Sequence, residues 1–516
     1  MASSRQSDIE SPEIGLKGWA RWFWRQLTSM RTALILLLAL AAAAIPGSVY
    51  PQRSADPNGV TQFFDNQPEL AKVLDAFQIF DVYSSVWFSA IYILLFVSLI
   101  GCVIPRAQVH YKSLRSAPPI APKNFARMPA HQKVAAKNAG VVASASEILK
   151  SQGYRVVVSG KSVAAERGYL RETGNLVFHY ALIGVLIAVG FGGGFSYSGQ
   201  RVLVEGDTFV NNLTGYDSIS PGTFFDESQL TPLSVTLDKF TVNFDLQNQT
   251  NLGTPLDFRA DVTSKIGLNG EPTQSTIRVN EPLEMPNAKL YLTGNGYAPV
   301  ITIRDAKGNV AFSGPTAYLP QDKNYTSLGV IKVPDALPEQ IGMISFFYPT
   351  VGELESGAFT SIYPDPIDPL LTLNVYTGDL GLDSGIPRNV YALDVTNMEQ
   401  VAGREAPNPA IELTVGQSAE LPGGIGTVRF DGLLRFASLD IAFNPGGIWV
   451  LMFSFVALIA IVISLSITRR RIWVRVGHER IEYAGLARGD DDQLDEILKE
   501  IQEEIEEQAN PTWEEC

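Results

Sequence analysis

Four long apolar segments constrain the fold of this chain more than any other feature of its sequence. They are residues 32–50, 86–104, 174–195 and 446–467, and none of them contains Asp, Glu, Lys or Arg. About 20 consecutive apolar residues in a helix match the hydrocarbon thickness of a bilayer, so each segment predicts a transmembrane helix. We therefore expect an integral membrane protein with four transmembrane α-helices.

The N-terminal residues 1–31 are polar and then basic, and two spans follow in close succession. This pattern favours a retained anchor over a cleavable signal peptide. Within it, the stretch "KGWARWFWRQL" predicts a short amphipathic helix on the inner leaflet, with its cations at the lipid phosphates. A simple flank of the first span is an equally good interpretation.

The distribution of Lys and Arg predicts the orientation of the spans. Residues 105–173 carry twelve basic residues and three glutamates, and "TRRR" follows the fourth span, whereas residues 51–85 carry five acidic and two basic residues. Basic loops stay on the cytoplasmic side. We expect residues 1–31, 105–173 and 468–516 to be cytoplasmic, and residues 51–85 and 196–445 to lie outside the plasma membrane.

The long segment 196–445 predicts a large all-β extracytoplasmic domain between the third and fourth spans. β-Branched and alternating runs such as "LSVTLDKFTVNFDL" recur between Gly, Pro and Asn turns, which is typical of a sandwich or barrel. The stretch "RDAKGN" is a hairpin-turn signal. The segment has no histidine, and its "YPDPIDP" loop, residues 363–369, is only a weak candidate for a calcium site.

Two smaller soluble parts are expected in the cytoplasm. In residues 105–173, "ASASEILKSQ" predicts a helix with a serine cap, and "GYRVVVSG" with "SVAAERG" predicts a hairpin, giving a small α/β loop between the second and third spans. The tail 468–516 contains an acidic amphipathic helix with apolar residues at helical spacing. Docking on a partner and remaining solvated are equally good expectations for it.

Composition excludes several classes of function. The net charge is −14 with a pI near 4.9, which gives no support to a nucleic-acid partner. The two cysteines, Cys102 and Cys516, form no CxxC or CxxCH motif, so the chain has no dithiol centre and no haem attachment site of its own. Walker, GxSxG and Ser/His/Asp signatures are also absent from the sequence. We interpret Cys102 as a small buried residue.

One histidine stands out among the four in the sequence. His110, His131 and His478 lie in basic stretches and are expected to be surface residues, whereas His179 lies about 7 Å inside the third span at helical rise. Ionisable groups at such depth are costly and are often functional. A hydrogen bond to a neighbouring helix, a proton relay, a metal ligand and an axial haem ligand all remain open for His179. One histidine cannot supply both axial ligands of a haem.

The spans carry motifs of a known family. "LTSMRTALILLLALAAAAIPGSVYPQR", "FDVYSSVWFSAIYILLFVSLIGCVIPR" and "GYLRETGNLVFHYALIGVLIAVG" resemble the ResB family, the CcsB-type subunit of system II cytochrome c biogenesis. The order of four spans with a large outer domain before the last is also similar. The resemblance covers nearly the whole chain.

The resemblance implies a role in haem handling. Proteins of this kind pair with a ResC/CcsA-type membrane protein, and together they move haem b across the membrane to the CxxCH motifs of apocytochrome c, which a thioredoxin-like thiol reductant keeps reduced. The histidine of "GNLVFH", here His179, would be an axial ligand of the haem iron, with the second ligand from the partner. The chain would then be a non-catalytic subunit of a holocytochrome c synthase, or haem lyase, complex.

Residues around His179 allow further expectations. The glycines at 184, 190 and 192–194 either leave room for a porphyrin or permit ordinary close packing of helices. Gly174 and Asn175 would open the helix start, and Arg167 and Arg171 would meet haem propionates or, more readily, lipid phosphates. The main alternative function is a membrane-anchored β-domain accessory or sensor without haem. A transporter has little support, because the spans carry no carboxylate.

Overall fold

The chain forms two compact units, each with its own core. The computed structural model describes residues 15–135, 140–245, 253–267, 269–382, 391–477, 480–489 and 491–509. The first unit comprises Met1–Gly192 and Pro445–Cys516, and the second comprises Gly193–Asn444. His478 and Cys516 lie outside the described residues.

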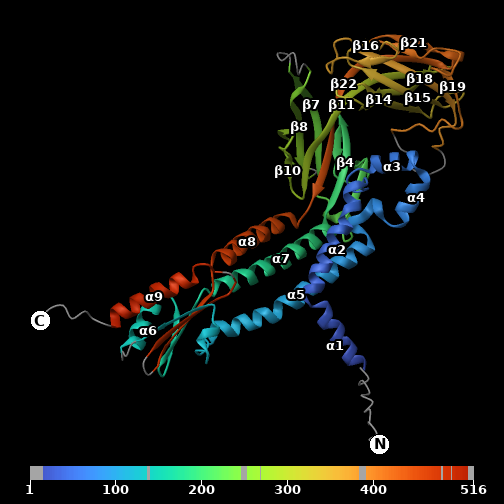
Figure 1. Cartoon of the computed structure of the whole chain (residues 1–516). Helices are drawn as coiled ribbons and strands as arrows, with labels where there is room; N and C mark the ends of the chain where they lie inside the picture. The colour runs from blue at the N-terminus through green and yellow to red at the C-terminus, as the bar shows by residue number, and fades with distance from the viewer. Residues whose placement is uncertain are drawn as a thin grey trace, which may run out of the picture. The chain divides into compact units, whose positions relative to one another are not determined.

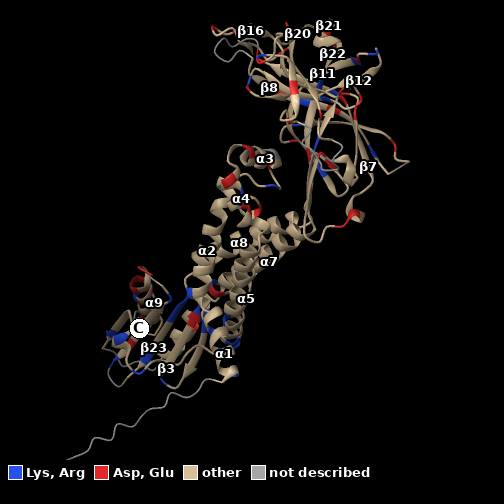
Figure 2. Cartoon of the chain, turned by 90° about the vertical axis from the view of Figure 1, so that its right-hand side faces the viewer, with Lys and Arg blue, Asp and Glu red and all other residues tan. Residues whose placement is uncertain are grey.

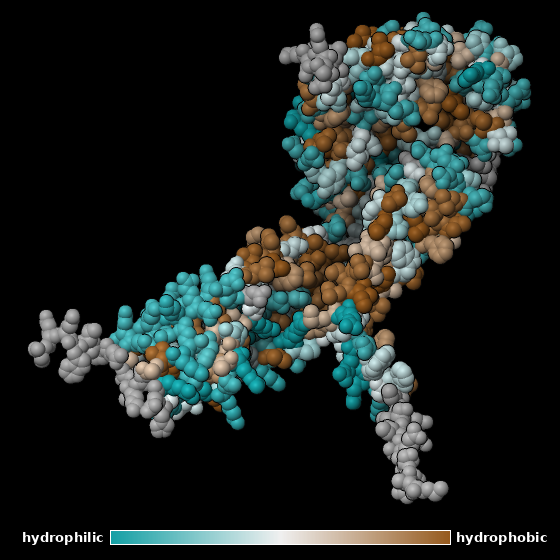
Figure 3. Space-filling model, viewed as in Figure 1, coloured by the Kyte–Doolittle hydropathy of each residue, from teal (hydrophilic) through white to brown (hydrophobic). Residues whose placement is uncertain are grey.

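Four helices are long and apolar enough to cross a membrane, as the sequence predicts. They are α2 (Met30–Val49), α5 (Val86–Arg115), α7 (Leu170–Phe195) and α8 (Gly447–Ser466). Serine side chains start two of them: Ser29 Oγ accepts from the Thr32 amide and Ser85 Oγ from the Phe88 amide. Apolar side chains cover the surface of these helices (Figure 3), and charged residues gather towards their ends (Figure 2).

Two of these helices continue beyond the predicted spans into polar sequence. α5 does not end at residue 104 but runs past Pro105 to Arg115, and α7 begins at Leu170 rather than 174. Hydropathy marks where charge begins, whereas the backbone hydrogen bonds of a helix continue until a residue such as Ser116 turns extended. Gly174 therefore lies inside α7 and does not open its start, and the extensions bring polar side chains together at one end of the helices.

α7 and α8 lie side by side because glycine lets them approach (Figure 1). A Cβ built on Gly174 would lie 2.7 Å from the Ala460 carbonyl oxygen, and one on Gly184 would lie 2.6 Å from the Phe453 ring. These two glycines support the interpretation of ordinary helix packing.

Gly174→Ala should therefore destabilise the α7–α8 pair by about 1–3 kcal/mol, since the new methyl group meets backbone that cannot rotate away. Thermal unfolding of the full chain in detergent would measure the loss. Gly190→Ala is the matched control in α7, because its Cβ would lie 3.9 Å from the Tyr92 ring, an ordinary contact. Equal melting temperatures for the two variants would contradict the close approach at Gly174.

A five-stranded antiparallel sheet joins two parts of the chain that the sequence predicts as separate. Its order is β1 (Ala130–Val134), β24 (Ile481–Ala487), β23 (Arg470–Val476), β3 (Ser162–Arg167) and β2 (Arg155–Ser159). The predicted 155–167 hairpin is present, but the strands of residues 470–487 were not predicted. We call residues 117–167 and 470–509 the α/β module.

Two helices cover one face of this sheet: α6 (Val141–Ser151) and α9 (Leu494–Ala509) share a single apolar core with the strands. α6 has Gly140 at its N-cap and no side-chain cap, so the predicted serine cap is wrong. The acidic helix α9 docks in cis, with Leu494, Leu498, Ile501 and Ile505 buried. On the other face, the Trp473 indole donates to the Pro119 carbonyl oxygen at 2.9 Å, which holds the segment before β1 against the sheet.

The remaining helices of the first unit are short. α1 (Leu16–Leu27) confirms the predicted N-terminal helix, and α3 (Pro57–Asn66), α4 (Pro68–Ala76) and the 3-10 helix η1 (Ile79–Ser84) fold residues 51–85 around Phe80. Cys102 Sγ donates to the Thr28 carbonyl oxygen, which links α5 to the α1–α2 connection. Cys102 is partly buried, not fully buried as predicted.

Beyond the end of α7, the described residues of the second unit form β-strands, loops and short 3-10 turns. Its largest sheet has the order β10 (Leu283–Met285), β11 (Ala288–Asp305), β22 (Gly426–Phe443), β4 (Tyr197–Val204), β6 (Ser218–Pro221), with β12 (Val310–Pro315) on β11 and β21 (Ser418–Leu421) on β22. The "RDAKGN" stretch forms the β11–β12 hairpin, as predicted.

The two long strands β11 and β22 serve two apolar cores, each closed by a further sheet. The first of these sheets has the order β13 (Leu319–Pro320), β14 (Ser327–Val333), β15 (Ile341–Tyr348), β18 (Leu370–Gly378), β19 (Met398–Ala402), and β20 (Ile411–Leu413) pairs with β18. The second sheet has the order β5 (Thr208–Val210), β7 (Leu233–Phe244), β8 (Pro255–Ile266), β9 (Thr273–Arg278). A small hairpin is β16 (Val351–Glu353) with β17 (Phe359–Ser361). The domain is thus two sandwiches sharing one ribbon.

Candidate functional site

His179 lies in α7, partly buried, with its two ring nitrogens in different environments. Its Nδ1 lies 2.7 Å from the backbone oxygen of Asn175, so Nδ1–H donates to that carbonyl. Its Nε2 makes no hydrogen bond with any residue that the structure describes. The ring also packs edge-on against Phe178, with centroids 5.2 Å apart. The structure therefore fixes Nδ1 as a donor and leaves Nε2 without a hydrogen-bond partner among the described residues.

This arrangement suits an iron ligand. Histidine ligands commonly donate their second ring nitrogen to a backbone carbonyl, which fixes the tautomer and the orientation of the ring. A lone pair left unsatisfied in an apolar helix has a free-energy cost that a bound metal would remove. No group of three His, Cys, Asp or Glu within the described ranges could hold a metal ion, so a chelated metal site has no support there.

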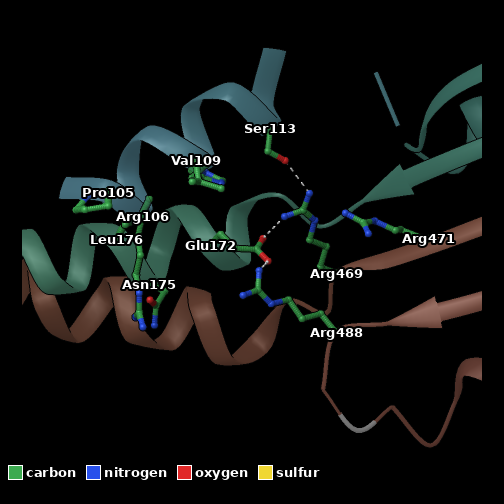
Figure 4. A pocket seen from close by; sticks show the side chains of 11 residues that line it. Pro105, Arg106, Val109, Ser113, Glu172, Asn175, Leu176, Arg469, Arg471 and Arg488 are labelled. Carbon is green, nitrogen blue, oxygen red and sulfur yellow. Dashed lines mark hydrogen bonds and ion pairs between the residues drawn. The ribbon is translucent and has the colours of Figure 1, made fainter. Parts of the chain in front are cut away.

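A pocket lined by several charged side chains opens near the N-terminal end of α7 (Figure 4). Its cavity volume is ≈ 570 Å³, and its walls come from the extension of α5, the first two turns of α7 and the segment after α8. Arg106 and His110 line it from α5, and Glu172 and Asn175 line it from α7. Asn175, whose carbonyl holds the His179 ring, therefore belongs to both features.

Three arginines from the C-terminal segment complete the pocket: Arg469, Arg471 and Arg488. Arg469 lies 3.2 Å from Glu172 and 2.7 Å from Glu166, and Arg488 lies 2.6 Å from Glu172. Figure 4 shows Glu172 pointing towards both Arg469 and Arg488, and Arg469 reaching Ser113 of α5.

Glu166 of β3 forms ion pairs with two of these arginines, Arg469 and Arg471. Arg471 Nε donates to its Oε1 at 2.7 Å and the Tyr169 hydroxyl to its Oε2 at 2.8 Å, with only 2% of Glu166 exposed. Burial by itself would raise the pKa of Glu166, but these hydrogen bonds and the charges of Arg469 and Arg471 hold the pKa below its ordinary value. Glu166 is therefore ionised at neutral pH and fixes the arginines.

His110 is not the surface residue that its basic surroundings predict. It is 8% exposed, and its Nε2 lies 2.9 Å from Thr173 Oγ1. Since the Thr173 hydroxyl donates to the Tyr169 carbonyl oxygen at 3.1 Å, it accepts from His110 Nε2–H. His110 Nδ1 is buried without a hydrogen-bond partner. Local composition could not reveal this burial, because α7 covers the ring from 63 residues away.

The two arginines expected to meet an anion lie outside this pocket. Arg167 donates to the Gln152 carbonyl oxygen at 3.2 Å and stacks on the Tyr154 ring, within the α/β module. Arg171 forms no ion pair with a carboxylate in the described part of the chain and does not line the pocket. A better sequence signal for the pocket is the stretch "TRRRIWVRV". Its alternating arginines predict a strand with one charged face, and this stretch supplies Arg469 and Arg471 to the pocket.

In the suggested calcium loop, one of the two carboxylates forms an ion pair with an arginine. Asp365 forms an ion pair with Arg435 at 2.9 Å, and the Tyr297 hydroxyl donates to the Pro364 carbonyl oxygen at 2.8 Å. Arg435 also donates to the Tyr297 hydroxyl at 2.7 Å. The loop is thus tied to β11 and β22 by a structural network.

Comparison with known proteins agrees with the motifs in the spans. The model of the ResB-like family matches residues 30–499. Proteins named "Cytochrome c biogenesis protein CcsB" are similar: that of Microcystis aeruginosa is 25% identical over 294 residues (55% of this chain, 62% of that protein). That of Synechococcus sp. strain WH7803 is 28% identical over 272 residues (51% and 58%), and that of Nostoc sp. strain PCC 7120 is 25% identical over 312 (58% and 64%). The matches thus span about three fifths of each relative's length.

Proposed function

The chain belongs to the ResB-like family, and from this membership we propose that it is a multi-pass membrane subunit of the machinery of cytochrome c biogenesis. Its role would be to assist the transport of haem b across the plasma membrane and its delivery to the CxxCH motifs of apocytochrome c. The curated relatives named CcsB and the four apolar helices support this proposal.

The orientation we propose places both termini and the α/β module in the cytoplasm. The excess of Lys and Arg in residues 105–173 and after α8 supports it, and so does the acidic character of residues 51–85. Residues 51–85 and the β domain would then be extracytoplasmic. In this orientation, His179 lies near the cytoplasmic end of its span, where haem would enter.

His179 is the residue we propose as an axial ligand of the transported haem. The observation that carries the proposal is its tautomer: Nδ1–H is held by the Asn175 carbonyl, while Nε2 is left free in an apolar helix. Haem here is cargo that this imidazole binds and orients. A second axial ligand would come from a ResC/CcsA-type haem-handling partner.

The chain would act as part of a larger machine. It has no dithiol motif, so attaching haem to reduced cysteines would depend on the partner and on a thioredoxin-like thiol reductant. The β domain would recruit apocytochrome c. Strand β9 supports this idea, because it is the last strand in the order of its sheet and an extended peptide can pair with such an edge.

Replacing His179 with alanine should remove the haem absorption band of the complex purified with its partner, because the iron loses this ligand. The band would be measured per mole of chain after co-expression. Ile187→Ala is the matched control, since it truncates an exposed side chain of the same helix two turns further on. It should leave the band in place.

An equal haem band in wild type and His179→Ala would reject His179 as a ligand. A wild-type complex without any haem band would instead favour the alternative, a membrane-anchored β-domain accessory protein. Both outcomes require that the variant be extracted in the same amount as the control, which the yield of pure chain measures directly.

A further inference from the structure

We propose that the pocket between α5, α7 and the segment after α8 binds the paired carboxylates of a porphyrin ligand. This proposal deepens the proposed function and rests on it. The pocket comprises Arg106, His110, Glu172, Asn175 and the arginines at 469, 471 and 488. Its cavity of ≈ 570 Å³ has the size of a small-molecule site, about 300–1,000 Å³.

The pocket has a surplus of positive charge, which suits an anionic ligand. Its four arginines are neutralised in part by Glu172, which lines the cavity, and by Glu166 behind it. Two positive charges remain uncompensated. A porphyrin with two propionates carries two negative charges at one edge of its ring, so the surplus of the pocket and the charge of the ligand match. Arginine forks bind carboxylates with two parallel hydrogen bonds.

Within the described residues, Arg106 has no carboxylate partner and His110 Nδ1 has no hydrogen-bond partner. Arg106 contacts the sulfur of Met30 and forms no ion pair with a carboxylate that the structure describes. His110 Nδ1 is buried without any hydrogen bond, in a side chain that is more than nine-tenths buried. Buried polar atoms of native proteins are nearly always satisfied. A ligand carboxylate in the cavity would accept hydrogen bonds from Arg106, whereas His110 Nδ1 is itself an acceptor, because Nε2 carries the ring proton towards Thr173.

The position of the pocket identifies the ligand as one that also reaches His179. Asn175 lines the pocket, and His179 follows it by four residues, which places the imidazole on the same helix face about 6 Å further along α7. An amphipathic ligand with a metal at its centre and carboxylates at one edge spans both features. A lipid phosphate would fill only the arginine end, and it is therefore the competing occupant.

Iron-free protoporphyrin IX and its dimethyl ester distinguish carboxylate recognition from iron ligation. The full chain in phosphatidylcholine nanodiscs should bind the free acid about tenfold more tightly than the ester, as followed by porphyrin fluorescence against empty nanodiscs. Arg106→Gln and Arg488→Gln should each reduce this preference. Both side chains are exposed enough for the fold to survive their replacement. Arg171→Gln, an arginine at the start of the same helix α7, should not change it.

Equal affinity for the acid and the ester would overturn the pocket proposal and leave His179 untouched, since the probe contains no iron. The pocket proposal would also be overturned if Arg171→Gln and Arg106→Gln lost the preference for the free acid equally. That result would show that the preference depends on overall charge and not on the pocket. The last measurement repeats the comparison of acid and ester in nanodiscs that contain phosphatidylglycerol. If they abolish the preference, the occupant is a lipid phosphate and the carboxylate assignment is wrong. His179→Ala should lose the haemin absorption band yet retain the preference for the free acid.

Discussion

Glu166→Gln is expected to lower the free energy of unfolding of the α/β module by about 3–5 kcal/mol, because it leaves buried arginine charge uncompensated. Arg469 is 7% exposed and Arg471 is half-buried, and both donate to the same carboxylate oxygen. Hydrogen exchange of the β23 and β24 amides in the full chain would measure the loss. Their exchange should accelerate a hundredfold or more.

The effect of Glu166→Gln should depend on pH. Because the pKa of Glu166 is lowered in the folded chain, its contribution to stability is fully present above the ordinary glutamate pKa of 4.5 and is lost as pH falls through the folded value. Variant and wild type should therefore converge in acid. Glu147→Gln, which replaces an exposed glutamate of α6, should change little at any pH. Equal exchange rates at pH 7 for the Glu166 variant and wild type would show that the arginines do not need this carboxylate.

The four apolar helices and the class of the β domain were predictable because both depend on local patterns. A run of apolar residues is itself the requirement for crossing a bilayer, and alternation is itself the requirement for a half-buried strand. The exact helix ends were not predictable in this way. Residues 105–115 remain helical for reasons of backbone geometry, although their composition is that of a loop.

The α/β module could not be predicted, because its strands come from distant parts of the sequence. Arg471 pairs with Glu166 in register across about 300 residues, and no local pattern specifies such a partner. The strand signal in "RRRIWVRV" was present, but the adjacent membrane span made its arginines look like a charged flank. The apolar stripe of α9 likewise showed that the helix needs a partner surface without showing that the chain provides it.

The candidate site was predictable in part. A lone histidine in an apolar span identified His179, since burying such a group is costly. The tautomer of His179, the burial of His110 and the arginine pocket depend on contacts between α5, α7 and the C-terminal segment. Arg167 and Arg171 are near His179 only in sequence, whereas the arginines of the pocket are brought together by the fold.

Leu498→Ala should destabilise the α/β module by about 2–5 kcal/mol, because it leaves a cavity in a core that α9 closes. Leu498 is fully buried among the strands and α6, so its truncation should also speed limited proteolysis of the tail. Lys499→Ala is the matched control on the same helix turn. Its side chain is 68% exposed and lies 3.8 Å from Glu503, a pair worth at most about 0.5 kcal/mol.

These two variants decide where the acidic helix belongs. If α9 docks in cis, Leu498→Ala lowers the melting temperature and accelerates exchange in β24 without any other protein present, while Lys499→Ala does neither. If α9 instead served a partner and left the sheet, Leu498→Ala would match wild type in the isolated chain. It would then weaken only co-purification of that partner. Docking in cis is also what the short connection favours. Strand β24 ends at Ala487 and α9 begins at Leu494, so the chain has only a few residues between the sheet and the helix that packs on it.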